Sequence, residues 1–162
     1  IINKKKNEFK CFIANDNSNG QIVLSGTMSN IEKLSIYLNS LNIKNIKLSV
    51  SAPFHCELMK TATELMRNEL AKIVFKDFKT ALISNVTAQE IDNSLLIRDL
   101  LVRQIESRVR WRESINYMIK NGVNNFIEIG PGKVLSGLVK RIDKKVKVSA
   151  INNEEDINKI AI

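Results

Sequence analysis

The stretch Ser49-Val50-Ser51-Ala52-Pro53-Phe54-His55-Cys56-Glu57-Leu58-Met59 contains the only histidine of this 162-residue chain. Before it, apolar and polar residues alternate over residues 44–50, which predicts a β-strand. After it, apolar residues at helical spacing predict a helix over residues 58–73, with Ser51 as a candidate N-cap. His55 is therefore expected in or just before the first turn of a helix.

A histidine at a strand-to-helix junction is a candidate general base. The positive end of a helix dipole favours the neutral imidazole over the imidazolium, and a neutral ring can accept a proton. Acyl transfer needs such a base to activate a hydroxyl or thiol nucleophile. The alternative is a histidine that caps or packs a helix end, and for an isolated histidine this structural role is the more common one.

The histidine segment, residues 51–60, resembles the active-site histidine segment of malonyl-CoA:acyl-carrier-protein transacylases. Further segments resemble that family in the same order and at compatible spacing: residues 15–21, Leu101-Val102-Arg103-Gln104, Val109-Arg110-Trp111 and residues 128–138. No serine lies in a G-x-S-x-G elbow, and the family's malonate-binding arginine and N-terminal oxyanion loop have no counterpart here. The chain therefore resembles the C-terminal half of a transacylase and is expected to lack the N-terminal half.

The predicted elements divide the chain into two parts of an α/β fold. Residues 1–50 give a β-β-α-β series, which is a ferredoxin-like βαββαβ unit without its opening strand and helix. The predicted elements are strands at 9–14, 21–25 and 44–50, a turn at 15–20 and a helix with a Ser29/Glu32 capping box. In residues 51–162 strands alternate with helices, which predicts a parallel layer: strands at 79–86, 125–129 and 146–151, helices at 94–106, 111–120 and 133–142, and a short surface helix after 153. The resemblance implies a truncated ferredoxin-like small subdomain followed by part of an α/β-hydrolase-like parallel-sheet subdomain.

The resemblance also implies the roles of individual residues. His55 would be the general base for a serine outside this chain, and the backbone carbonyl of Gln104 would accept a hydrogen bond from the histidine Nδ1 and orient the ring. Phe54 resembles the malonyl-selecting version of the motif, because its ring leaves less space for an α-methyl branch. Asn17 and Gln21 match a loop near the cleft over the thioester, although both are also ordinary turn residues.

The charge of the chain suits acidic partners better than nucleic acid. The net charge is +8, but the lysines are scattered and aromatic residues make up only 6%, so no base-stacking stripe is present. Coenzyme A and an acidic carrier protein fit this charge. Cys11 and Cys56 lack metal-ligand spacing, so we expect neither a metal nor a cofactor besides the coenzyme A thioester substrate.

The chain is expected to be a cytoplasmic protein without a membrane segment. No apolar run approaches the roughly 20 residues needed to cross a bilayer. The basic lead Ile1-Ile2-Asn3-Lys4-Lys5-Lys6 lacks the apolar region of a signal peptide. Gly130-Pro131-Gly132-Lys133 before a helix offers free N–H groups to an anion, but it is not a Walker motif, so a structural strand-to-helix turn is preferred.

These patterns together predict a malonyl-CoA:acyl-carrier-protein S-malonyltransferase of fatty-acid synthesis that works by ping-pong acyl transfer. Its partners would be malonyl-CoA, acyl carrier protein and the N-terminal half of the same enzyme, and this chain alone is expected to be inactive. A piece of a polyketide-synthase-type acyltransferase is the close alternative. A non-catalytic remnant that binds acidic carrier protein, or a basic nucleic-acid binder, is the alternative from another class.

Overall fold

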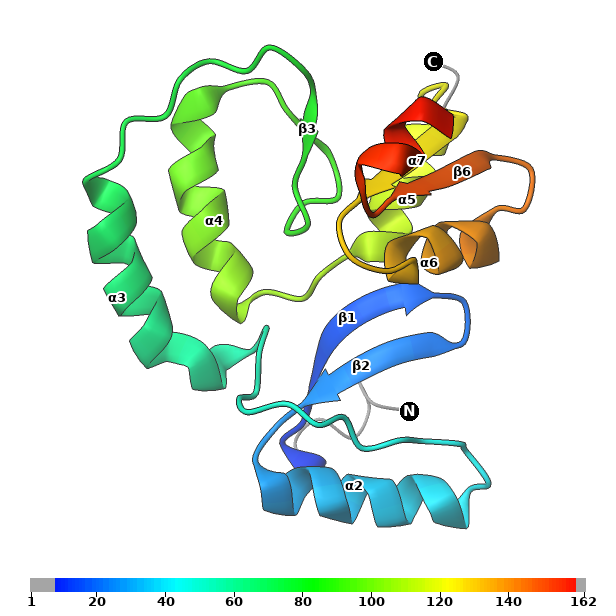
Figure 1. The fold of residues 1–162 in the computed structure, drawn as a ribbon. Helices are drawn as coiled ribbons and strands as arrows, with labels where there is room; N and C mark the ends of the chain where they lie inside the picture. The colour runs from blue at the N-terminus through cyan, green and yellow to red at the C-terminus, as the bar shows by residue number, and fades with distance from the viewer. Residues whose placement is uncertain (1–7, 160–162) are drawn as a thin grey trace.

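A computed structural model of the chain describes residues 8–159, so the basic lead at residues 1–6 lies outside the described part. Helices and short sheets mix in an α/β arrangement of small units that follow one another along the chain (Figure 1). None of the helices between residues 8 and 159 is long and apolar enough to cross a membrane.

The first unit is the predicted hairpin, covered by one helix. Strands β1 (Phe12–Ser18) and β2 (Gln21–Ser25) pair antiparallel through a turn in which Gly20 has a φ of 79°. The turn is shorter than predicted, because Asn15 pairs with Val23 and β1 continues to Ser18. Alternate β1 residues are buried, so the polar residues that were predicted as a turn instead belong to a strand with one buried face.

Helix α2 (Met28–Ser40) follows the hairpin and buries Leu34 and Leu38 against Cys11. The predicted Ser29/Glu32 capping box is wrong. Thr27 is the N-cap, and its hydroxyl accepts from the Asn30 N–H at 3.4 Å. The helix therefore starts two positions earlier, where Thr27 offers an equally suitable hydroxyl.

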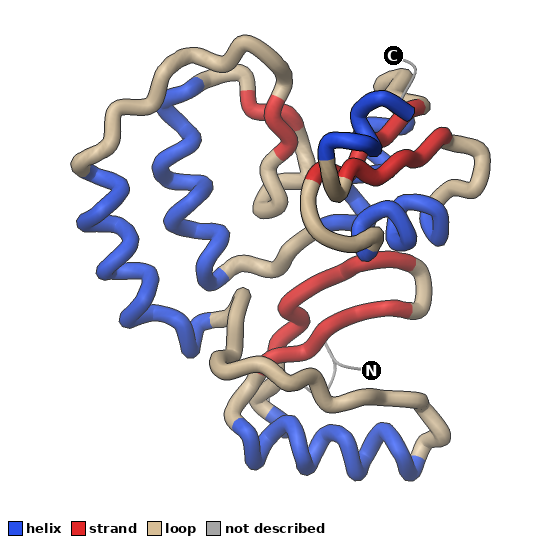
Figure 2. The backbone as a smooth tube through the Cα atoms, viewed as in Figure 1, coloured by secondary structure: helices blue, strands red, loops and turns tan. Residues whose placement is uncertain are grey.

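The predicted strand at residues 44–50 does not form. Figure 2 shows the link between α2 and the next helical turn as loop. The alternating apolar side chains of this segment are exposed: Ile46 at 73%, Leu48 at 53% and Val50 at 60%. A strand needs a neighbouring backbone for its hydrogen bonds, and no other strand in residues 8–159 pairs with this segment.

Two helices carry the next unit. A short 3-10 turn η1 (Glu57–Met59) leads into α3 (Lys60–Ala71), and η2 (Ser94–Leu96) leads into α4 (Ile97–Glu106). Helices α3 and α4 lie side by side and run in opposite directions (Figure 1). The predicted N-cap Ser51 is wrong, because the cap positions are Cys56 and Met59, and neither side chain makes a capping hydrogen bond.

Between α3 and α4 the predicted strand at 79–86 is reduced to two residues. Strand β3 (Leu82–Ile83) pairs antiparallel with β4 (Glu90–Ile91) instead of joining a parallel layer. The rest of the apolar segment folds back, so that Val86 packs with Ile91 and Leu100 in a small core of its own. The local antiparallel partner takes the place of a parallel neighbour that the described residues do not supply.

The last unit is a β-α-β arrangement close to prediction. Helix α5 (Trp111–Lys120) precedes β5 (Asn125–Ile129), α6 (Val134–Ile142), β6 (Lys147–Ile151) and the short helix α7 (Glu154–Lys159). β5 and β6 are parallel and pair residue for residue from Asn125 with Lys147 to Ile129 with Ile151. Ile115, Val139 and Val146 form the core between this pair and the helices α5 and α6.

Candidate active site

His55 lies just before η1, with its backbone in the left-handed region at a φ of 61°. Its N–H donates to the Ile105 carbonyl at 3.2 Å, and its ring Nδ1 lies 3.0 Å from the Gln104 carbonyl oxygen. Backbone and ring are therefore both attached to the last turn of α4. The residue as a whole is partly exposed.

The end of α4 explains why these two carbonyls are available. The last four carbonyls of a helix have no partner within the helix. The Ser107 N–H donates to the Arg103 carbonyl at 2.9 Å, and the backbone then becomes extended, with a ψ of 145° at Ser107. The carbonyls of Gln104 and Ile105 are left for His55.

The contact with Gln104 determines the tautomer of the ring. A carbonyl oxygen only accepts hydrogen bonds, so Nδ1 must carry the proton. The lone pair of Nε2 is then free to accept a proton from another group. The side-chain amide nitrogen of Gln104 also lies 3.4 Å from His55 Nδ1, but two donors cannot form a hydrogen bond with each other. The amide nitrogen instead donates to the Ser107 carbonyl at 3.5 Å. This arrangement is what a general base requires.

Phe54 lies next to the histidine, with 44% of its surface exposed. The Ser25 hydroxyl at the end of β2 donates to the Phe54 carbonyl at 2.7 Å and so joins the hairpin to the histidine segment. Cys56 is buried and its thiol donates to the Pro53 carbonyl at 3.1 Å. Burial raises the pKa of Cys56 and also that of Cys11, so neither thiol is an activated nucleophile.

Asn17 and Gln21 lie on the hairpin. Asn17 is half-buried on β1 between the buried residues Asp16 and Ser18. Gln21 is at the opposite end of β2 from Ser25, and its side chain accepts a hydrogen bond from Arg141 of α6. The structure thus brings His55, Gln104 and Phe54 together, whereas Gln21 is held at the far end of the hairpin. The substrate roles of Asn17 and Gln21 stay predictions.

At the glycine-rich turn before α6, a carboxylate of the chain itself binds N–H groups at the start of the helix. The Glu128 carboxylate accepts from the N–H groups of Leu135 at 3.1 Å and Ser136 at 2.7 Å. Hydrogen bonds from Ser136 lower the pKa of Glu128. The chain's own carboxylate therefore occupies the start of the helix, which supports the structural turn over a phosphate cradle.

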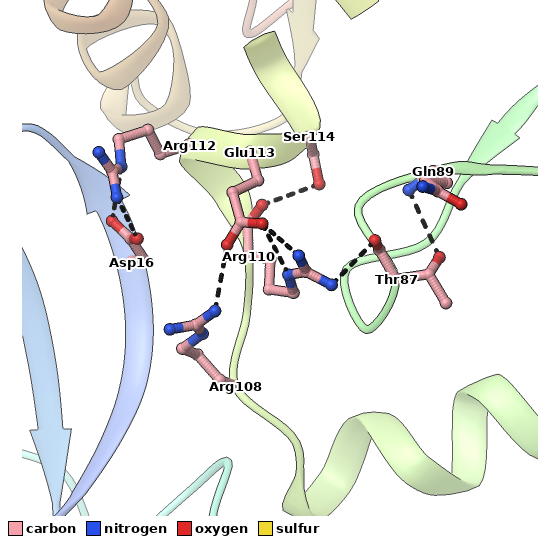
Figure 3. A network of polar contacts seen from close by, with 8 residues as sticks. All are labelled: Asp16, Thr87, Gln89, Arg108, Arg110, Arg112, Glu113 and Ser114. Atoms are coloured by element: carbon pink, nitrogen blue, oxygen red, sulfur yellow. Dashed lines mark hydrogen bonds and ion pairs between the residues drawn. The ribbon is translucent and has the colours of Figure 1, made fainter. Parts of the chain in front are cut away.

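The sequence patterns did not single out a charged network between α4 and α5 (Figure 3). Glu113 accepts from Arg108 at 3.1 Å and from Nε of Arg110 at 3.0 Å, while Nη1 of Arg110 donates to the Thr87 carbonyl at 3.0 Å. Arg112 bonds both oxygens of Asp16 at 3.0 and 2.7 Å. The available signal was the spacing of Arg108 and Arg110, because residues two apart in an extended segment share one face.

In the described part of the chain, no group of three or more His, Cys, Asp or Glu residues is placed to hold a metal ion.

The acyl transferase domain family matches residues 4–158, and the chain belongs to this family. Within it, the chain is 45% identical over 146 residues to the malonyl CoA-acyl carrier protein transacylase of Bacillus subtilis. That match covers 90% of this chain but 46% of the relative. The chain spans about half the length of the curated relatives it matches.

Solved structures agree in fold and in extent. An acyl-carrier-protein-S-malonyltransferase from Bartonella henselae superposes with a TM-score of 0.91 at 38% identity, covering 98% of this chain and 52% of that one. A malonyl-transacylase solved in complex with a type II PKS acyl-carrier protein gives a TM-score of 0.91 at 32% identity, covering 98% and 53%. The predicted family and α/β class are thus confirmed.

Proposed function

We propose that this chain is the histidine-bearing C-terminal half of a malonyl-CoA:acyl-carrier-protein S-malonyltransferase of fatty-acid synthesis. The observation that carries the proposal is the 3.0 Å contact between His55 Nδ1 and the Gln104 carbonyl, which leaves Nε2 free to accept a proton. The 45% identity to a named transacylase favours this function over a polyketide-synthase piece.

His55 would serve both halves of a ping-pong reaction. Nε2 takes the proton of a serine hydroxyl supplied by the N-terminal half, and the serine oxygen attacks the malonyl thioester carbonyl. The C–S bond breaks, the coenzyme A thiolate receives the proton from the imidazolium, and malonyl-serine remains. The carrier-protein thiol then gives its proton to Nε2 and attacks this ester, and the serine oxygen leaves and recovers the proton. The Gln104 carbonyl orients the ring throughout.

Phe54 would set the preference for malonyl over methylmalonyl groups. Its ring is 44% exposed beside the histidine, and the hydrogen bond from Ser25 fixes its backbone. In the complete enzyme, Phe54→Ser should raise the use of methylmalonyl-CoA relative to malonyl-CoA by about tenfold, because one methyl group in a pocket is worth about 1 to 3 kcal/mol. Competition between the two thioesters measures this ratio, and an unchanged ratio would refute the assignment.

Asn17 and Gln21 would approach the thioester from the hairpin. The support for this proposal is that the hairpin carrying both residues is joined to the histidine segment by the hydrogen bond from Ser25 to the Phe54 carbonyl. Binding of an acidic carrier protein is supported by the net charge of +8 and by the relative solved in complex with an acyl-carrier protein.

The N-terminal half would complete both parts of the fold. Residues 1–50 would be a ferredoxin-like subdomain in which an added strand pairs with residues 44–50, and residues 51–162 would belong to an α/β-hydrolase-like sheet. Parallel strands are normally covered on both faces, yet Ile127 and Ile129 of β5 are 41% and 80% exposed. These uncovered side chains support a missing layer of polypeptide.

A chimera tests the proposed function directly. The N-terminal half of the Bacillus subtilis relative is placed before this chain in one polypeptide, and malonyl transfer from coenzyme A to acyl carrier protein is assayed. We expect transfer by the chimera, a loss of about 10³-fold with His55→Ala, and a change within about threefold with Gln104→Ala, because only the backbone of Gln104 acts. Equal activity of His55→Ala and the parent chimera would end the assignment.

A further inference from the structure

The connector from Ser107 to Arg110 decides whether the two carbonyls of α4 stay available to His55. In a continuing α-helix, the N–H of residue i bonds the carbonyl of residue i−4. If α4 continued, the Arg108 N–H would donate to the Gln104 carbonyl, and the Val109 N–H would donate to the Ile105 carbonyl. These are the two acceptors that hold His55.

Backbone contacts draw the connector away from the helix. The Val109 N–H donates to the Ala14 carbonyl of β1 at 2.8 Å, and the Asp16 N–H donates to the Val109 carbonyl at 2.9 Å. The Arg110 N–H donates to the Asn85 carbonyl at 3.1 Å. The connector is thus attached to the hairpin on one side and to the turn between β3 and β4 on the other.

Side-chain hydrogen bonds also hold the connector in its extended conformation. Glu113, in the first turn of α5, bonds the guanidinium groups of Arg108 and Arg110 on both sides of Val109, and Arg110 also holds the Thr87 carbonyl (Figure 3). The Arg110 and Glu113 side chains are each 35% exposed, so the pair is less screened than the pairs on the outer faces of the helices. Hydrogen bonds from Arg110 lower the pKa of Glu113, which keeps the carboxylate charged.

We propose that Arg110 and Glu113 are positioning residues: they hold the connector extended so that the Gln104 carbonyl remains the partner of His55 Nδ1. The inference rests on the proposed function for its catalytic meaning. Neither side chain touches the reacting atoms; the pair acts through the backbone of residues 107–110.

The tautomer of His55 provides a direct readout, because it is the only histidine of the chain. The ring nitrogens of the ¹⁵N-labelled 162-residue chain are observed by NMR at about pH 8.5, above the ordinary pKa of histidine. We expect the Nδ1–H form in the wild type. Arg110→Gln and Glu113→Gln should each lower the ratio of the Nδ1–H to the Nε2–H form about fivefold, the change that loss of one ordinary hydrogen bond produces.

Arg103→Gln is the matched control. It removes an arginine next to Gln104 that pairs with Asp99 of the same helix at 3.4 Å, and it leaves the connector intact. The wild-type ring signal should persist in this variant. A loss of the Nδ1–H form there as large as in Arg110→Gln would overturn the proposal.

Two other results would also overturn it. One is a wild-type ring signal in both Arg110→Gln and Glu113→Gln with the amide signals of α3 and α4 unchanged. The other is loss of the folded amide pattern in both variants, because the network would then support the whole fold and not one ring. The ring signal is measured without substrate, so a negative NMR result does not contradict malonyl transfer by the chimera. Equally, a chimera without malonyl transfer does not contradict the NMR result.

Discussion

Strand β5 and residues 44–50 were both predicted as strands, and only β5 forms. The crossover helix α6 connects β5 to β6, and the two strands pair along the whole length of β5. Residues 44–50 have a clearer alternation, yet no strand in the described part of the chain lies beside them. The comparison teaches that alternation specifies which face of a strand is apolar, whereas the strand itself requires a partner backbone.

The largest effect should come from the core that supports β5. Ile115 is 1% exposed and packs with Val139 and Val146, so Ile115→Ala should lower the free energy of unfolding by about 2 to 5 kcal/mol. Urea unfolding followed by circular dichroism measures this loss. A change below about 1 kcal/mol would mean that this core does not hold the parallel pair, and the contrast with residues 44–50 would disappear.

Acid should weaken the attachment of α5 while leaving residues 44–50 unaffected. The pKa of Glu113 is lowered in the folded protein by hydrogen bonds from Arg110, so its contribution is present above the unfolded pKa and is lost as the pH falls through the folded pKa. Because the side chain is 35% exposed, we expect no more than about 1 kcal/mol. Unfolding measured from pH 6 down to pH 3 in wild type and Glu113→Gln checks this; equal slopes would contradict it.

The smallest effect should be at residues 44–50 themselves. Leu48 is 53% exposed, so Leu48→Ala in this chain should change the free energy of unfolding by less than about 0.5 kcal/mol. In the chimera with an N-terminal half, the same substitution should cost about 1 kcal/mol or more, because the proposed added strand buries the segment. The same urea titration in both backgrounds gives the difference, and identical values would argue against strand addition.

Local signals predicted the elements whose partners lie nearby. β2, α5 and β5 have the predicted bounds, because a hairpin turn, helical periodicity and a β-α-β crossover specify them within a short stretch. The segment at 79–86 failed for the same reason as residues 44–50, since its apolar run took the nearest antiparallel partner.

The site was predictable only in part. The residue types around His55 indicated a base, and the family resemblance indicated the Gln104 carbonyl, but no propensity predicts a φ of 61° at a histidine. The hydrogen bond from Arg110 to the Thr87 carbonyl also escaped prediction, because it joins segments that are 23 residues apart in sequence and depends on how α4 ends. Contacts of this kind are specified by the tertiary structure and not by local patterns.

The left-handed backbone at His55 limits which amino acids can replace it without disturbing the segment. Most side chains resist this conformation, whereas asparagine adopts it more readily than alanine does. An inactive enzyme intended for holding unreacted malonyl-CoA should therefore carry His55→Asn, which removes the imidazole while keeping the chain path that presents Phe54. His55→Ala would combine the loss of the base with a backbone free to relax.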